Sequence, residues 1–143
     1  MEFLMTYGWA ILVVLIAIGA LAYFGVLNPG RFLPSSCTIV AGIGCDDFKV
    51  TAAEVQLILR NGVGDDLTLV GVTVLTCATQ DPNANGNGNW IDGTVLGGAA
   101  GITLTGCTNG VVGAKFKQDV VITYTGSSGI PHSVTGSLTS RVE

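Results

Sequence analysis

The sequence predicts an α+β fold in which one long apolar helix at the N-terminus precedes a β-sandwich. Residues 3–30 carry no charge, and several short stretches of residues 37–143 alternate apolar and polar side chains. Turn signals such as Asn61-Gly62 and Asn109-Gly110 separate those stretches. About seven or eight short strands at this spacing are typical of an immunoglobulin-like sandwich. We therefore predict a helix over residues 1–28, a linker over 29–36 and a sandwich over 37–143.

The composition disfavours an ordinary cytosolic enzyme. Charged residues make up 11% of the 143-residue chain, against about 25% in a typical globular protein, and the net charge is -4. The six lysines and arginines are scattered, which disfavours a nucleic-acid surface. The single histidine, His132, has no activated nucleophile near it in the sequence. We therefore predict no catalytic residues and do not expect an enzyme.

The N-terminal apolar run is long enough to cross a lipid bilayer. Residues 3–27 would span about 37 Å as a helix, against ~30 Å for the hydrocarbon core of a bilayer. Asn28-Pro29-Gly30 is predicted to end this helix, because proline lacks an amide proton and disfavours helical backbone in the residue before it. Since the run is apolar on all sides, lipid or other copies of the same helix must cover it.

Three interpretations of this run compete. A cleaved secretory signal would use the small residues of Ala20-Leu21-Ala22, but Glu2 stands where such a signal carries positive charge. A plain membrane anchor leaves Glu2 without a use. In a filament subunit, the helix would wait in the membrane and then move into a bundle of identical helices. A carboxylate in that dry core must be paired, so Glu2 would set the axial register between neighbouring copies.

The first 34 residues resemble a known family of filament proteins. Residues 1–16, MEFLMTYGWAILVVLI, are similar to the N-terminus of archaeal type IV pilins, which are made with a prepilin-type (class III) leader. Residues 25–29 and 31–34 resemble the exit from the pilin helix. A glutamate stands at the fifth position of the mature chain in that family, and Glu2 matches it. The resemblance therefore implies that a few residues that follow the leader precede Met1.

The resemblance also implies a function and partners. The chain would be the major pilin of an adhesive extracellular filament, inserted in the membrane before assembly. A prepilin peptidase would remove its leader, and an assembly ATPase with a membrane platform would extrude it. An archaellum subunit and a monomeric, membrane-anchored surface-binding module remain as alternatives. Helices are expected to approach through small residues, with larger ones filling the gaps between them. The predicted assembly residues are Glu2, Gly8, Ala10, Leu12, Ile16, Ala17, Gly19, Ala20 and Phe24.

Period-two alternation predicts the strands of the body. The clearest stretches are residues 55–60, 67–72, 102–105, 120–125 and 134–142. In the second stretch, Leu67, Leu69 and Gly71 share one face. The acidic pairs Asp46-Asp47 and Asp65-Asp66 are expected in solvated turns. The many Ser and Thr residues reflect either strand propensity or O-linked sugar, and no Asn-x-Ser/Thr sequon is present.

Four cysteines without a CxxC pair favour disulfides over a zinc or redox site. Three pairings are possible. We favour Cys37–Cys45, which closes a short loop, and Cys77–Cys107, which closes the longest irregular stretch. Four buried free thiols are the alternative. Disulfides would place the body outside the cell.

One loop has the oxygen ligands of a calcium site. Residues 81–92 fit the calcium-loop template with Gly86 at the sixth position, although the last ligand is Asp rather than Glu and no helices are predicted beside the loop. The alternative is an Asn/Gly-rich surface loop, so no cofactor is predicted. Trp90 is expected to cap the edge of the sandwich rather than to bind sugar, and His132 is expected to be a structural residue of a sheet. The candidate calcium ligands are Asp81, Asn83, Asn85, Asn89 and Asp92.

Overall fold

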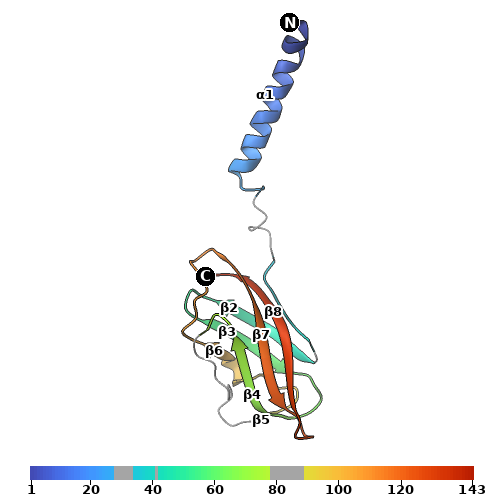
Figure 1. Cartoon of the computed structure of the whole chain (residues 1–143), viewed down its shortest axis with the longest axis vertical. Helices are drawn as coiled ribbons and strands as arrows, with labels where there is room; N and C mark the ends of the chain where they lie inside the picture. Colours follow the sequence, from blue (N-terminus) through green and yellow to red (C-terminus); the bar gives the residue numbers. More distant parts are fainter. Residues whose placement is uncertain (28–33, 41, 78–88) are drawn as a thin grey trace. The chain divides into compact units, whose positions relative to one another are not determined.

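The computed structural model describes residues 1–27, 34–40, 42–77 and 89–143. The chain divides into two compact units, Met1–Leu33 and Pro34–Glu143. The first contains the helix α1 (Glu2–Tyr23), and the second, called the body below, contains the strands (Figure 1). The prediction of an apolar N-terminal helix followed by an antiparallel β domain is confirmed.

Helix α1 ends earlier than Asn28-Pro29 predicts. Its last residue is Tyr23, and Gly25 follows with a φ of +69°. The Gly25 amide donates to the Ala22 carbonyl (3.1 Å), and the Val26 amide donates to the Leu21 carbonyl (3.1 Å). This pair of bonds is a Schellman motif, which needs a left-handed residue that glycine adopts without a steric penalty. The predicted helix end was therefore wrong, because Gly25 ends the helix before the proline.

The body consists of two antiparallel sheets. The first has the order β1-β8-β7-β4-β5 and the second the order β2-β3-β6. A short 3₁₀ turn, η2 (Gly98–Ala100), precedes β6. The strands of the first sheet are β1 (Ser36–Ile39), β8 (Pro131–Arg141), β7 (Lys115–Thr125), β4 (Leu67–Val74) and β5 (Asn89–Trp90). Those of the second are β2 (Ile43–Val50), β3 (Val55–Asn61) and β6 (Ile102–Leu104).

The core of the body is built by alternate residues of its strands. In β3, Val55, Leu57 and Leu59 are fully buried, and in β7 the residues Val120 and Ile122 are fully buried. The period-two pattern of the sequence therefore marks the inward face of both strands. All buried residues of the described chain belong to this unit, so the body has a complete core of its own.

Two β-bulges break the expected alternation. The register of β4 on β7 shifts between Thr68 and Gly71, and Leu69 within the shift is 65% exposed. The extra residue reverses the parity, so Val70 rather than Leu69 enters the core, and the prediction that Leu69 shares a face with Leu67 was wrong.

The second bulge lies in β2, where the register on β3 shifts between Cys45 and Asp47. Asp46 and Asp47 therefore lie in a strand rather than in the predicted solvated turn. The Arg60 guanidinium from β3 holds the Asp46 carboxylate at 2.7 Å, and an exposed pair of this kind adds little stability. The acidic side chains instead mark an exposed edge strand.

Two disulfides cross-link the body. Cys37–Cys45 joins β1 of the first sheet to β2 of the second, and Cys77–Cys107 joins the turn after β4 to the segment after β6. These are the two pairs that the loop lengths favoured. They indicate an extracellular location, because disulfides persist in oxidising compartments.

A buried amide organises the loops at one end of the body. The Asn61 side-chain nitrogen donates to the carbonyls of Asp65 and Trp90, both at 2.9 Å, and its oxygen accepts from the Val63 amide at 3.0 Å. The Trp90 indole, 1% exposed, donates to the Thr94 carbonyl at 3.0 Å. Trp90 is therefore a core residue of an edge strand, with no ring face open to a sugar.

The two disulfides should differ in their contribution to stability. They close loops with sequence separations of 30 and 8 residues. The chain-entropy model then gives about 3.7 kcal/mol for Cys77–Cys107 and about 2.5 kcal/mol for Cys37–Cys45. We expect the double variant Cys77→Ala/Cys107→Ala to unfold at lower urea concentration than Cys37→Ala/Cys45→Ala. Trp90 fluorescence in a Trp9→Phe background measures this, and equal midpoints would contradict the ranking.

Candidate functional site

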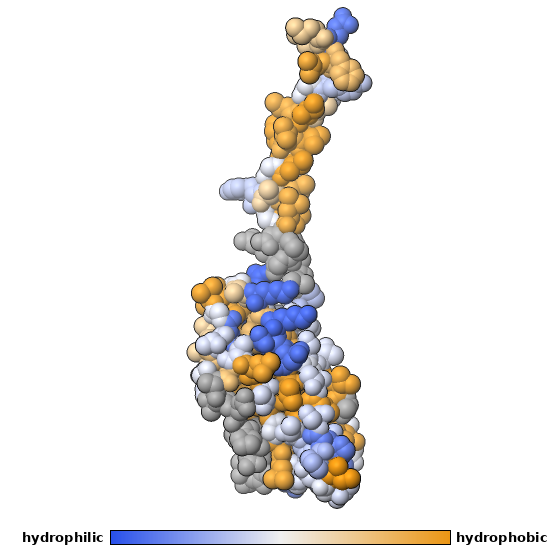
Figure 2. Space-filling model, viewed as in Figure 1, coloured by the Kyte–Doolittle hydropathy of each residue, from blue (hydrophilic) through white to orange (hydrophobic). Residues whose placement is uncertain are grey.

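The surface of α1 is the most unusual feature of the described chain. No residue of the helix is buried, and Phe3, Trp9 and Leu15 are 74%, 68% and 64% exposed. Figure 2 shows apolar side chains along the visible face of this helix. Covering one such side chain is worth about 1.5–3 kcal/mol.

The length and composition of α1 would allow it to cross a membrane. At ~1.5 Å per residue, its 22 residues span about 33 Å, close to the ~30 Å of a hydrocarbon core. Tyr7 and Trp9 lie near one end of the helix and Tyr23 lies at the other. Aromatic residues with one polar atom are enriched at both interfaces of a bilayer.

Small residues lie on opposite sides of α1. Gly8 and Gly19 are about three turns apart and share one side, whereas Ala10 and Ala17 are about two turns apart and share the other. A Cβ atom added at Gly8 or Gly19 would meet nothing within 4 Å. Each glycine weakens a helix by about 1 kcal/mol relative to alanine. No contact among the described residues requires glycine at either position.

The larger predicted assembly residues are distributed around the helix. Leu12, Ile16 and Phe24 are 58%, 62% and 72% exposed. By helical periodicity, Leu12 and Ile16 lie next to the glycine side, while Ala20 and Phe24 lie farther round. The structure therefore places the predicted residues on several sides of α1 rather than on one face.

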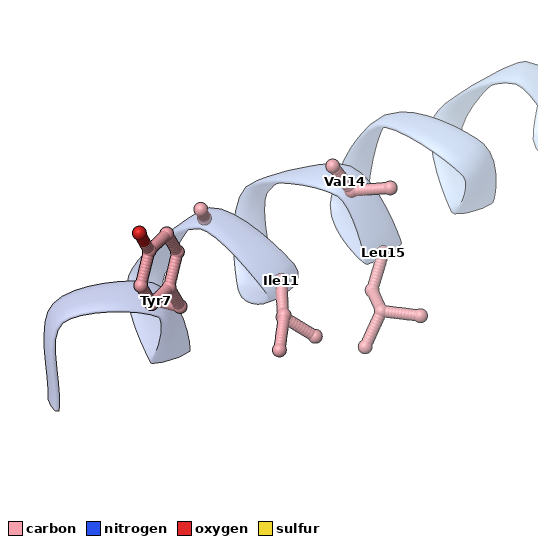
Figure 3. A pocket seen from close by; sticks show the side chains of 5 residues that line it. Tyr7, Ile11, Val14 and Leu15 are labelled. Atoms are coloured by element: carbon pink, nitrogen blue, oxygen red, sulfur yellow. The ribbon is translucent and has the colours of Figure 1, made fainter. Parts of the chain in front are cut away.

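A shallow apolar groove on α1 was not singled out from the sequence. It is lined by Tyr7, Ala10, Ile11, Val14 and Leu15, and Figure 3 shows Tyr7, Ile11 and Leu15 following one another along the helix with Val14 beside them. Their spacing of i, i+3, i+4, i+7 and i+8 is the pattern by which a helix presents one apolar stripe. The signal was present in the sequence, but the uniform apolarity of the helix concealed it.

The polar groups near the start of α1 differ in their partners. The Thr6 hydroxyl donates to the Glu2 carbonyl at 2.8 Å, so this hydroxyl is already satisfied when the helix leaves water. The Glu2 side chain lies in the first turn, where the helix dipole favours a negative charge. Among the described residues, the Glu2 side chain makes no hydrogen bond or ion pair, so this part of the chain gives Glu2 no cation.

Most of the calcium candidate lies outside the described residues. Asp81, Asn83 and Asn85 belong to that part, whereas Asn89 lies in β5 and Asp92 in the turn that follows. The Asp92 carboxylate accepts from the Gly64 amide at 3.0 Å. Within the described ranges, no group of three or more His, Cys, Asp or Glu side chains is placed to hold a metal ion.

The remaining polar residues that the sequence analysis considered, Asp65, Asp66 and His132, also have partners within the body. The Asp65 carboxylate accepts from the backbone amide and the hydroxyl of Ser127, and the Asp66 carboxylate accepts from the Asp92 amide at 2.9 Å. The Ser127 bonds hold the pKa of Asp65 below its ordinary value of 3.8. His132 stacks on Tyr124 with ring centroids 5.5 Å apart. These contacts join neighbouring turns and strands.

The sequence matches no protein-family model and no curated protein.

The Asp65–Ser127 contact should make stability depend on acid pH. Because the folded pKa of Asp65 is lowered, its stabilising effect is present above about pH 3.8 and is lost as the pH falls toward the folded pKa. We expect Ser127→Ala to unfold more readily than the unchanged chain at pH 6, with the difference shrinking toward pH 2. Urea denaturation at both pH values measures it, with Ser128→Ala as the control. A difference that is the same at both pH values would contradict this role.

Proposed function

We propose that this chain is the structural subunit of an extracellular filament of the archaeal type IV pilus kind, with α1 packed against other copies of α1 in the filament core. The observation that carries the proposal is that α1 is apolar all round and has no buried residue, whereas the body has a complete core. A single copy cannot cover this helix in water, and many copies can cover one another. Adhesion is the expected use of the filament, by resemblance to the pilin family.

The opposite placement of the small residues supports packing against several neighbours. A two-fold dimer needs one close-contact side on each helix, whereas a filament subunit must contact copies on different sides. Gly8 and Gly19 offer one close approach, and Ala10 and Ala17 offer another about half a turn away. The groove of Tyr7, Ile11 and neighbouring residues provides a concave surface for a neighbour's side chains.

Glu2 supports a defined register between copies. In a dry helical bundle its carboxylate needs a donor, and an unpaired buried charge costs several kcal/mol. Because the described residues provide no cation for it, we propose that a neighbouring subunit does so. This pairing is satisfied only at one axial offset between helices, which would select a single helical arrangement.

We further propose that the body is an immunoglobulin-like sandwich. The order β8-β7-β4-β5 corresponds to strands G-F-C-C′ of that fold, and β2-β3-β6 corresponds to A-B-E. The hairpins β2–β3, β4–β5 and β7–β8 pair within a sheet, while the connections between them change sheets. Strand β1 is an addition at the edge beside β8. The body would be displayed on the cell surface, and the precursor would be held in the membrane by α1.

A monomeric membrane anchor is the second candidate, because α1 is long enough to cross a bilayer. Negative-stain microscopy of the full chain after detergent removal separates the two candidates. The filament proposal expects thin helical fibres. Single particles that stay dispersed only in detergent would overturn it.

Replacing Glu2 tests the register role. We expect Glu2→Ala to leave the body folded and to lower fibre yield by about tenfold or more, since breaking a buried ion pair costs about 3–5 kcal/mol. Asp119→Ala, an exposed acid in β7, is the matched control and should assemble normally. Fibre mass after sedimentation gives the yield, and circular dichroism checks the body. Unchanged yield from Glu2→Ala would remove the register role.

Filling the glycine side tests close packing of helices. Because open space surrounds Gly19, Gly19→Leu should fold as a monomer in detergent without strain. In the filament its side chain would hold neighbouring helices apart. Overpacking of this kind costs about 1–3 kcal/mol, so fibre yield should fall about tenfold. Val13→Leu enlarges a residue that is already bulky and should have a smaller effect; equal losses from both variants would argue against a close approach at Gly19.

A further inference from the structure

The two ends of the body carry opposite charge. The basic end is where β7 begins and β8 finishes, and it holds Lys115, Lys117 and Arg141, all exposed. The loop before β7 adds two apolar side chains to this end, Val111 and Val112, which are 76% and 72% exposed. The Gly113 amide ties this loop to the end of β8 through the Val142 carbonyl at 2.7 Å.

The acidic end lies at the opposite end of the body, where β4 and β8 begin and β7 finishes. Asp65, Asp66 and Asp92 gather there, because their hydrogen bonds join the turn before β4, the turn after β5 and the β7–β8 turn. Ile91 and Ile130 from these turns are 54% and 59% exposed. Both ends therefore combine exposed apolar side chains with an excess of one sign of charge. Each end also holds one residue of the other sign that is paired within the chain. These are Glu143, paired with Lys49 at the basic end, and Arg60, paired with Asp46 and bonded to the Gly93 carbonyl at the acidic end.

The bulge in β4 adds a third exposed apolar side chain to the acidic end. Leu69 has a φ of +49°, a conformation that costs a non-glycine residue about 1–3 kcal/mol, and its side chain is 65% exposed. The bulge in β4 thus turns a large apolar side chain toward solvent at a local cost. The same bulge places Val70, which is fully buried, in the core, and this burial offsets the local cost.

We infer that neighbouring bodies dock head to tail, the basic end of one copy on the acidic end of the next. This inference rests on the proposed filament and adds a second contact to that of the helices. The partner is a second copy because each end presents the charge and the apolar side chains that the other end complements. Like ends would repel, which disfavours a two-fold contact between the same ends of two copies. A heterologous contact of this kind gives a ring if the rotation between copies closes and an open filament if it does not, and the proposed filament requires the open case.

The surfaces between the ends are poorly suited to the same task. On the outer face of the first sheet, cross-strand pairs such as Thr38–Ser137 and Thr123–Ser133 present small hydroxyl side chains. The edge strand β2 carries a bulge and the charged Asp47 and Lys49, which oppose strand addition from another copy. Charge complementarity is therefore concentrated at the ends.

Zero-length cross-linking of assembled fibres tests the contact directly. A carbodiimide joins a lysine to a carboxylate only when the two touch. We expect peptides that link Lys115 or Lys117 to Asp65, Asp66 or Asp92, present in fibres and absent from the detergent-dispersed chain. The pair Lys49–Glu143, 3.5 Å apart within one chain, should react in both samples and serves as the control for the chemistry. Fibres that give only the control link would overturn the head-to-tail contact.

Charge variants measure the strength of the head-to-tail contact. Lys115→Glu/Lys117→Glu changes two exposed side chains, and Asp66→Asn/Asp92→Asn removes charge while keeping the hydrogen-bond acceptors. Each double variant should raise the subunit concentration needed for fibres by about threefold to tenfold at low salt. Asp119→Lys reverses an exposed charge in the middle of β7 and should leave that concentration unchanged.

Salt gives an independent readout. Added salt should raise the threshold concentration of the unchanged chain and have less effect on either double variant, because it screens exposed charges. Equal thresholds and equal salt dependence in all chains would overturn the inference while leaving the filament proposal standing. Absence of fibres from the unchanged chain would instead count against the filament itself.

Discussion

The exposed apolar surface of α1 is the constraint from which the functional argument follows. A helix that is apolar on one stripe can lie on a sheet, but α1 is apolar on every side and no residue of it is buried. Lipid and a bundle of like helices are the two environments that cover such a surface completely. Gly8 and Gly19 separate these environments, because lipid gains nothing from a close approach of backbones whereas a neighbouring helix does. The glycines therefore favour contact between protein chains over simple anchoring.

The body, in contrast to α1, buries its apolar residues within its own fold. Its two sheets enclose a core that includes Trp90, Leu57 and Ile122, and its two disulfides join the sheets and their connecting segments. It therefore needs nothing from α1 to fold, and α1 can change its surroundings without disturbing the body. A subunit that moves from a membrane into a fibre requires this independence. In the proposed filament, assembly rather than the folding of one chain would offset the cost of exposing α1.

Most of the fold could be predicted from sequence because its determinants are local. The alternation in β3 and β7 is set by which side chains reach the core, and the absence of CxxC spacing favoured disulfides.

The wrong predictions share a different cause. The placements of Leu69 and Asp46 depend on β-bulges. The position of a bulge is set by the register against a partner strand, and no local sequence pattern reveals that register. The early helix end at Gly25 was missed because Pro29 gives a stronger signal of termination, although a glycine in the left-handed region ends a helix equally well. The separation of charge between the two ends likewise required the topology, since Asp65, Asp92 and Ser127 are distant in sequence.

Polar groups decide whether α1 is stable both in a membrane and in a bundle of identical helices. The Thr6 hydroxyl is bonded to the Glu2 carbonyl and so makes no demand on its surroundings. The Glu2 side chain differs, because it lies at the end of the helix, where in a membrane the headgroup region and water can solvate it. In a bundle that solvation is lost, and the carboxylate becomes costly at every axial offset except one that supplies a donor. Apolar packing alone would tolerate many offsets between smooth helices. In the proposed filament, a single acid at the helix end would thus convert a non-directional attraction into a specific geometry, which the charged ends of the body would reinforce.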